Sequence, residues 1–235
     1  MSDSAQFFKN RCEAGQALGA ALLPLAATHP LVLALPRGGV PVAFEVAQAL
    51  NAEMDLLFVR KIGMPGHEEY GLGAVVDGAA PQVVLDQAIL RAMQIDAQTI
   101  QTVVDRQLRE IERQRWLYTG NRQPRPVTGR VVIVVDDGIA TGGTMRAALQ
   151  ALRRNHPARL VLAVPVAAPD SLQLLSDECD QVVSLIQPAR LAAVGAFYED
   201  FSQVEDTEVM RLIEAADQRE NARSAGAGRK VPKQA

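Results

Sequence analysis

The chain has 235 residues, of which 48% are apolar and 22% charged, and its formal net charge is −3. This balance is typical of a soluble globular protein and gives no electrostatic footprint for nucleic acid. The two cysteines and three histidines are far apart, in no spacing that metal sites use. The apolar run at 17–27 follows acidic residues and contains Pro24, which argues against a signal peptide or a membrane span. We expect a cytoplasmic protein that binds neither nucleic acid nor membrane.

The first part of the chain predicts a helix, a strand and a second helix. Residues 4–27 carry apolar side chains at helical spacing and should pack on a sheet. Residues 31–35 form a short buried strand, which runs through PRGG at 36–39 into a helix at 42–50. An arginine beside free backbone N–H groups is a site for an anion. The alternative is a tight strand-to-helix turn with a solvated arginine.

A glycine-rich stretch follows the next strand, predicted at 55–59. Residues 60–73 contain four glycines and a proline, which predicts a long loop, and such loops in compact domains are usually functional or disordered. Arg60 and Lys61 at its base are either anion-binding groups or two solvated cations. We interpret His67 as a surface residue of this loop.

The middle of the chain predicts a helical layer. Short strands are expected at 74–76 and 83–85, on either side of a turn. Residues 87–118 have an apolar stripe at helical spacing and a charged opposite side, with a break near Asp96. A polar linker, GNRQPRPVTG at 120–129, then leads into the next strand.

The stretch VVIVVDDGIATGGTM at 131–145 combines groups suited to a small anionic ligand. Five aliphatic residues predict a strand buried on both faces, and the strand ends in Asp136 and Asp137. A glycine-threonine loop and a helix follow, and N–H groups at a helix start attract phosphate. The two carboxylates would repel a phosphate but suit sugar hydroxyls or a cation. A ligand with a phosphate end and a polyhydroxyl end would satisfy both halves.

Other nucleotide-binding loops fit this stretch poorly. The Walker pattern requires a lysine after the glycines, and the dinucleotide fingerprint leaves no place for an acidic pair directly after the strand. A receiver or phosphatase that uses the acidic strand end as phosphoacceptor would leave both glycine loops unexplained. A helix-capping glycine loop with a purely structural role remains a further alternative.

The C-terminal third predicts two more strands. Residues 159–164 and 181–186 form buried strands, with a helix between them that ends at about Cys179. Ser202 and Glu205 have capping-box spacing and predict the start of the last helix. The region 221–235 is rich in Ala, Gly, Lys and Arg and predicts a disordered tail.

The hydrophobic run, acidic pair and TGGT at 131–144, together with PRGG at 36–39, resemble the signatures of the type I phosphoribosyltransferases. The resemblance implies an α/β fold with an open parallel sheet flanked by helices, a mobile lid loop at about 60–73 and a small C-terminal hood at about 187–202. It also implies that the ligand is phosphoribosyl pyrophosphate (PRPP), with Mg²⁺ as cofactor held mainly by ligand oxygens, and a nucleobase-like acceptor.

Residue roles follow from the same resemblance. Asp136 and Asp137 would hold the ribose hydroxyls, and Asp137 with the lid cations Arg60 and Lys61 would serve catalysis. Backbone amides would bind the 5-phosphate at Ala140, Thr141, Gly142, Gly143 and Thr144, and pyrophosphate would bind at Arg37, Gly38 and Gly39. In this family the peptide before the basic residue of the pyrophosphate loop is often cis, which here is Pro36–Arg37.

Two points leave the acceptor and the activity open. Hypoxanthine-guanine members place a lysine in the hood before an aromatic residue, whereas this hood carries Arg190 and no lysine. Phe197 and Tyr198 would either stack on a base or lie in the core. The hypotheses are therefore a phosphoribosyltransferase, single-domain over 1–220 and able to form a homodimer, or a non-catalytic PRPP- or nucleotide-binding regulatory protein.

Overall fold

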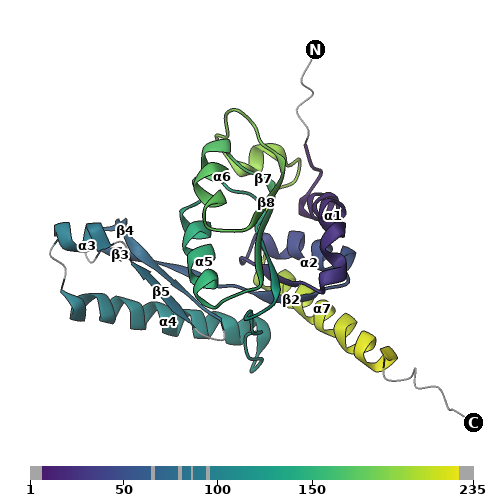
Figure 1. Cartoon of the computed structure of the whole chain (residues 1–235), viewed down its shortest axis with the longest axis horizontal. Coiled ribbons are helices and arrows are strands. Elements are labelled where there is room, and N and C mark those ends of the chain that lie inside the picture. The colour runs from purple at the N-terminus through teal and green to yellow at the C-terminus, as the bar shows by residue number, and fades with distance from the viewer. Residues whose placement is uncertain (1–6, 65–66, 79–80, 86, 94–95, 228–235) are drawn as a thin grey trace, which may run out of the picture.

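The computed structural model shows a parallel sheet covered by helices on both faces, with a smaller antiparallel sheet to one side (Figure 1). The strands of the parallel sheet lie in the order β2-β1-β6-β7-β8. Their bounds are Glu53–Leu56 for β2, Leu31–Ala34 for β1, Val131–Val135 for β6, Arg159–Val166 for β7 and Gln181–Ile186 for β8. The predicted α/β fold class is confirmed. The structure describes residues 7–64, 67–78, 81–85, 87–93 and 96–227.

The two faces of the sheet have separate hydrophobic cores. In β1, Val32 and Ala34 pack with one group of helices, whereas the alternate residues Leu31 and Leu33 pack with the other, as the period of a strand requires. The first core includes α1 (Arg11–Leu22), α2 (Gly39–Ala49) and α7 (Asp206–Ala227), and the second includes α5 (Gly143–Arg154) and α6 (Pro169–Ser176). Figure 1 shows α2 and α5 on opposite sides of the sheet.

Successive strands are added toward opposite edges of the sheet from β1 and from β6. From β1 the chain passes through α2 to β2 on one side, and from β6 it passes through α5 to β7 on the other. The carboxyl ends of two such strands form the crevice where ligands bind in open α/β sheets. The two glycine loops predicted as binding sites follow these two strands.

The N-terminal prediction of one helix over 4–27 is wrong in its limits. Helix α1 begins only at Arg11, because the Asn10 side chain accepts a hydrogen bond from the Glu13 N–H at 3.0 Å and caps it. Phe8 instead lies in an extended segment that bridges to Tyr198. A 3₁₀ helix, η1 (Leu23–Thr28), follows α1, and Cys12 near the start of α1 is exposed.

The predicted loop over 60–73 is also wrong, because most of it forms two strands. Strand β3 (Val59–Met64) pairs with β4 (His67–Val76), and β4 pairs with β5 (Gln82–Leu85), all antiparallel. A side chain at Gly73 would place its Cβ 2.0 Å from the Val84 carbonyl oxygen, so this glycine permits close strand pairing. Helix α5 packs against all three strands, and residues 65–66 lie outside the described part of the chain.

The helical prediction for 87–118 is confirmed, including its break. Helix α3 (Gln87–Met93) is followed by α4 (Ala97–Thr119), and Asp96 caps α4 by accepting the Thr99 N–H at 2.8 Å. Figure 1 shows α3, α4 and the small sheet projecting to one side of the parallel sheet. A buried arginine, Arg115, anchors α4 there, since it donates to the Asp77 carboxylate at 2.7 Å and to the Leu56 carbonyl at 2.8 Å.

The C-terminal segment returns across the molecule. After β8, the hood region contains a short 3₁₀ helix, η2 (Val194–Phe197), and α7 begins at Asp206, later than the capping-box spacing predicted. Helix α7 continues to Ala227, so residues 221–227 are helical; residues 228–235 lie outside the described range. Ion pairs hold α7 in place, for example Arg125 with Glu220 at 2.6 Å. None of the described helices is both long and apolar enough to cross a membrane.

Candidate functional site

The two predicted ligand loops are in direct contact at the carboxyl ends of β1 and β6. A Cβ at Gly38 would lie 2.1 Å from Oδ2 of Asp137, and a Cβ at Gly39 would lie 2.8 Å from the Val135 carbonyl oxygen. Only glycine allows this approach, which explains the pair in PRGG. The peptide Pro36–Arg37 is cis, as predicted from the family resemblance.

The loop after the acid pair is hydrogen-bonded to β7 and α6, and part of it is exposed to solvent. Its Ile139 N–H donates to the Val166 carbonyl at 2.9 Å, and the Ser171 hydroxyl donates to the Ala140 carbonyl at 2.6 Å. Gly142 adopts a left-handed conformation with φ of 76°, and α5 starts at the next residue. Thr141 and Gly143 are exposed. The start of α5 therefore presents backbone N–H groups toward solvent, which suits a phosphate.

Asp136 and Asp137 lie half-buried side by side at the end of β6. The Asp137 N–H donates to Oδ1 of Asp136 at 2.9 Å. Burial and the neighbouring Asp137 charge raise the pKa of Asp136 well above its ordinary value. Burial also raises the pKa of Asp137, although Arg11 opposes this shift. Two desolvated carboxylates of like charge are costly unless a ligand or a cation satisfies them.

Arg11 at the start of α1 contacts the acid pair, a role that the sequence analysis missed. Its Nε and Nη2 each lie 2.8 Å from Oδ2 of Asp137. Its Nη1 donates to the Ser202 carbonyl at 2.7 Å, and its guanidinium carbon lies 3.8 Å from the centre of the Phe201 ring. No local sequence pattern signals the contact with Asp137, because the two residues are 126 positions apart.

A cavity of about 340 Å³ beside the loops brings together several of the predicted residues. Arg37, Arg60 and Thr144 line it, from the segments after β1, within β3 and at the start of α5. Arg113 and Asp206 also line it, and neither was predicted as a site residue. The complete lining is Leu35, Pro36, Arg37, Leu57, Phe58, Val59, Arg60, Arg113, Gln114, Leu117, Tyr118, Thr144 and Asp206.

Carboxylates hold the arginines of this cavity in place. Arg60 pairs with Glu110 at 3.2 Å, and Arg113 pairs with the same carboxylate at 2.8 Å. Arg37 lies 3.5 Å from Asp206, whose carboxylate also accepts the Tyr118 hydroxyl at 2.6 Å. Burial and this hydrogen bond raise the pKa of Tyr118 to about 12, so Tyr118 is neutral and donates.

Lys61, the second predicted lid cation, lies apart from this cavity. Its side chain is exposed on β3, where Lys61 pairs with Ala74 of β4, and it is not part of the cavity lining. Because successive residues of a strand point to opposite faces, Arg60 and Lys61 cannot both face the same ligand while β3 keeps this form. The geometry therefore favours Arg60 as the cation on this side.

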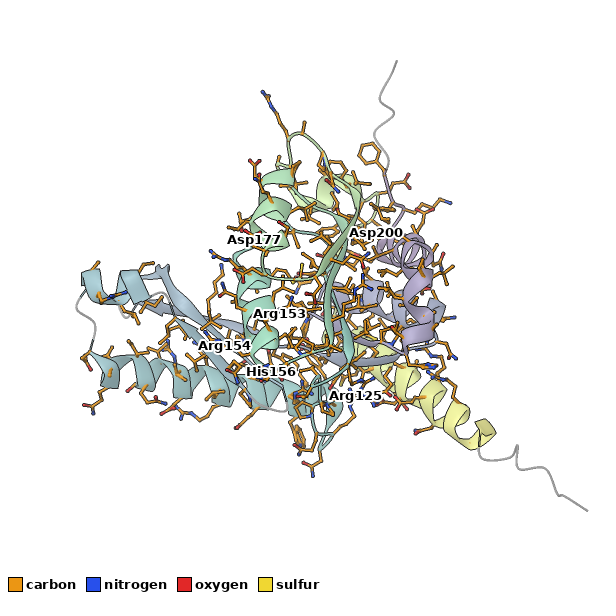
Figure 2. The ribbon with its side chains drawn as sticks, in the orientation of Figure 1. Arg125, Arg153, Arg154, His156, Asp177 and Asp200 are labelled. Carbon is orange, nitrogen blue, oxygen red and sulfur yellow. The ribbon has the colours of Figure 1, made fainter. Side chains whose placement is uncertain are left out.

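The hood aromatics differ in their surroundings. Tyr198 is buried against Phe8 and Phe201, with ring centres 5.7 and 4.9 Å away, and its hydroxyl donates to the Asp137 carbonyl at 2.6 Å. These contacts favour the core alternative for Tyr198 over base stacking. Phe197 is half-buried and stacks on exposed Phe7 at 6.0 Å. Figure 2 shows the hood residue Asp200 and the linker residue Arg125 toward opposite ends of the parallel sheet.

A metal ion would need ligands from a bound molecule as well as from the protein. Within the described ranges, no three His, Cys, Asp or Glu side chains are grouped closely enough to hold one. Asp136 and Asp137 offer two adjacent carboxylates beside the open loop. Mg²⁺ characteristically binds one or two carboxylates, water and substrate phosphates, so this donor set fits it when a phosphorylated ligand is present.

Known proteins resemble this chain over most of its length. Residues 21–199 match the model of the family described as "Phosphoribosyl transferase domain". The chain is 40% identical over 211 residues to "Putative phosphoribosyl transferase Rv0571c" of Mycobacterium tuberculosis (strain ATCC 25618 / H37Rv). This alignment covers 90% of the chain but 47% of that protein, so the chain spans about half the length of the curated relatives it matches.

Two further similarities agree with this match. A stretch of 55 residues is 42% identical to a uracil phosphoribosyltransferase of Lactobacillus delbrueckii subsp. bulgaricus, which covers 23% of this chain and 26% of that enzyme. The crystal structure of TT1426 from Thermus thermophilus superposes with a TM-score of 0.78 and 41% identity, covering 88% of this chain and 98% of that one. The chain belongs to the phosphoribosyl transferase domain family.

Proposed function

We propose that this protein transfers a 5-phosphoribosyl group from PRPP to a nitrogen nucleophile and releases pyrophosphate. The observation that carries the proposal is the meeting of the PRGG loop and the acid pair at one crevice, with Gly38 against Asp137. The loop that leads into α5, whose N–H groups suit a phosphate, and the arginine-lined cavity lie beside this crevice. PRPP carries a 5-phosphate, two ribose hydroxyls and a pyrophosphate, and each has a chemically matched partner here.

In the ground state, each part of PRPP would have its own partners. Backbone N–H groups of residues 140–144 at the start of α5 would bind the 5-phosphate. Asp136 and Asp137 would accept hydrogen bonds from the ribose hydroxyls, which also relieves their mutual repulsion. Arg37 and the Gly38–Gly39 backbone would bind pyrophosphate, once Arg37 exchanges Asp206 for the ligand.

The reaction would break the bond between C1 of the ribose and the pyrophosphate oxygen and form a bond from C1 to the acceptor nitrogen. Positive charge would grow on the sugar ring and negative charge on the departing pyrophosphate. Arg37 and Arg60 line the cavity where that charge would develop, so fixed guanidinium groups would stabilise it. Mg²⁺ bound through ligand oxygens would neutralise part of the same charge.

The acceptor is proposed to be a nucleobase-like molecule bound near the hood. Tyr198 is engaged in the core, whereas Phe197 of the hood is half-buried and Arg190 is exposed. Arg190 would donate to a carbonyl oxygen of a base, as a lysine does in 6-oxopurine enzymes of this family. The identity of the acceptor has to come from a screen of bases with and without an exposed oxygen.

The direct test is release of pyrophosphate from PRPP and Mg²⁺ across a panel of purine and pyrimidine bases. The proposal predicts release with at least one acceptor and loss of release in Asp136→Asn. Tight PRPP binding with no release across the panel would support the non-catalytic regulatory alternative. Since the curated relatives are about twice as long, a matching full-length relative should be screened beside this chain.

A further inference from the structure

We propose that Arg11 is a positioning residue for ribose recognition, holding the Asp137 carboxylate in the orientation that receives the sugar hydroxyls. This inference rests on the proposed function, since it concerns the same crevice. It adds a residue from the N-terminal helix to a site otherwise built by the loops after β1 and β6. Arg11 itself would not touch the reacting atoms.

The contact geometry is that of a fixed guanidinium rather than a surface ion pair. Nε and Nη2 both lie 2.8 Å from Oδ2 of Asp137, and the two side chains are only 11% and 15% exposed. Both nitrogens contact the same oxygen, which leaves Oδ1 of Asp137 for a ligand. Charge-assisted bonds of this length hold that oxygen of the carboxylate in place.

The third nitrogen and the face of the guanidinium are occupied by the hood. Nη1 donates to the Ser202 carbonyl at 2.7 Å, and the group lies 3.8 Å from the Phe201 ring centre. A guanidinium held on three sides cannot rotate freely, so it keeps the carboxylate oxygen that it contacts in a fixed position. The Tyr198 hydroxyl holds the Asp137 main chain from the same segment, at 2.6 Å from its carbonyl oxygen.

Electrostatics give a reason for this arrangement. Asp137 follows a second carboxylate, Asp136, and Arg11 places a positive charge 2.8 Å from Oδ2 of Asp137. An Asp137 carboxylate turned away from this orientation would be a poorer acceptor for a sugar hydroxyl. The oxygen that Arg11 holds is also the one that would lie 2.1 Å from a Cβ on Gly38, so Arg11 and the PRGG loop confine the same carboxylate oxygen.

The test separates ligands that carry sugar hydroxyls from those that do not. Arg11→Gln should weaken binding of ribose 5-phosphate about 10-fold, the scale of a hydrogen bond to a charged group. Binding of pyrophosphate and of propyl phosphate, which lack those hydroxyls, should stay unchanged. Arg11→Lys keeps the charge and should recover part of the loss. Calorimetric or NMR titration of each ligand gives the affinities.

Arg153→Gln is the matched control, because Arg153 forms an exposed ion pair with Asp180 at the far end of α5. It should bind all three ligands like the parent protein. Equal loss of all three ligands in the Arg11 variants, or no loss of ribose 5-phosphate, would overturn the positioning role. If Arg11→Gln unfolds, the same comparison is made with Arg11→Lys, which keeps one cationic contact. Failure of the parent protein to bind ribose 5-phosphate would instead count against the proposed function.

Discussion

Gly38 and Asp137 touch across the crevice, although they lie on different loops at the ends of adjacent strands. A Cβ added to Gly38 would be 2.1 Å from Oδ2 of Asp137 and 2.7 Å from its carboxyl carbon. The loop proposed for pyrophosphate and the carboxylate proposed for ribose are therefore one packed unit. A change on one loop should be felt by the ligand group assigned to the other.

Gly38→Ala should damage both stability and ligand binding. Gly38 has φ of −58°, which alanine adopts without strain, so any effect comes from the overlap with Asp137. Such overpacking costs about 1–3 kcal/mol of the free energy of unfolding. Chemical denaturation and ribose 5-phosphate titration measure the two effects. Stability and affinity equal to those of the parent protein would show that the loops are further apart than described.

Gly143→Ala should have the opposite effect on stability while still weakening phosphate binding. Apart from its chain neighbours and the backbone of its own helix, no described atom lies within 4 Å of a Cβ added there, and the residue begins α5. Replacing glycine by alanine at an unstrained position stabilises by about 0.4–1 kcal/mol. A phosphate seated on the loop, however, would meet the new methyl group. A more stable variant that binds PRPP normally would place the phosphate elsewhere.

Asp136→Asn should raise the melting temperature at alkaline pH and weaken ribose binding. The folded-state pKa of Asp136 is raised above its unfolded value by burial and by Asp137. The folded protein therefore binds this proton more strongly, and the free energy of unfolding falls as pH rises through the folded pKa. The gain in Tm over the parent should be larger at about pH 8 than at about pH 5. A change in Tm that is equal at both pH values would contradict the shift.

Arg60→Ala and Lys61→Ala should separate catalysis from binding. Arg60 lines the cavity and Lys61 lies exposed outside it, so the Arg60 variant should turn over roughly 10²–10³-fold more slowly, the scale for one preorganised donor. PRPP affinity should change little, because the charge develops only as the bond breaks. Arg37→Ala should instead weaken binding itself.

Other results for these three variants would contradict the prediction in different ways. If Lys61→Ala costs more turnover than Arg60→Ala, the segment after Val59 must leave its strand pairing with β4 in the working enzyme. If all three variants change only affinity, the regulatory alternative gains support. Steady-state pyrophosphate release, with PRPP affinity measured separately, gives both quantities for each variant.

The parallel sheet and its two loops could be predicted from the sequence because their signals are local. The runs at β1, β6 and β7 are largely aliphatic and buried, whereas β8, also predicted as buried, contains Ser184 and is half-buried along its length at the edge of the sheet. The break near Asp96 was predicted from the sequence, and the structure shows that Asp96 caps α4. The family signatures then identified the loops without any knowledge of long-range contacts.

The features that the sequence did not predict depend on contacts between residues far apart in the chain. Residues 60–64 and 67–73 lack alternation and carry three glycines, yet they pair as parts of β3 and β4, while β5 pairs with β4 and α5 packs against all three strands. The close Gly73–Val84 contact needs the very glycine that indicated a loop. Arg11 belongs to a helix whose apolar positions could be predicted, but its bond to Asp137 depends on tertiary packing alone.

The most direct test of the account is calorimetric titration of PRPP in the presence of Mg²⁺, with the parent protein and Asp136→Asn compared side by side. A PRPP site at the acid pair predicts saturable binding by the parent, competition by pyrophosphate, and a loss in the variant of about 1.5–3 kcal/mol of binding free energy. The variant should remain folded by its melting curve. No binding of PRPP by the parent protein at millimolar concentration would contradict the account.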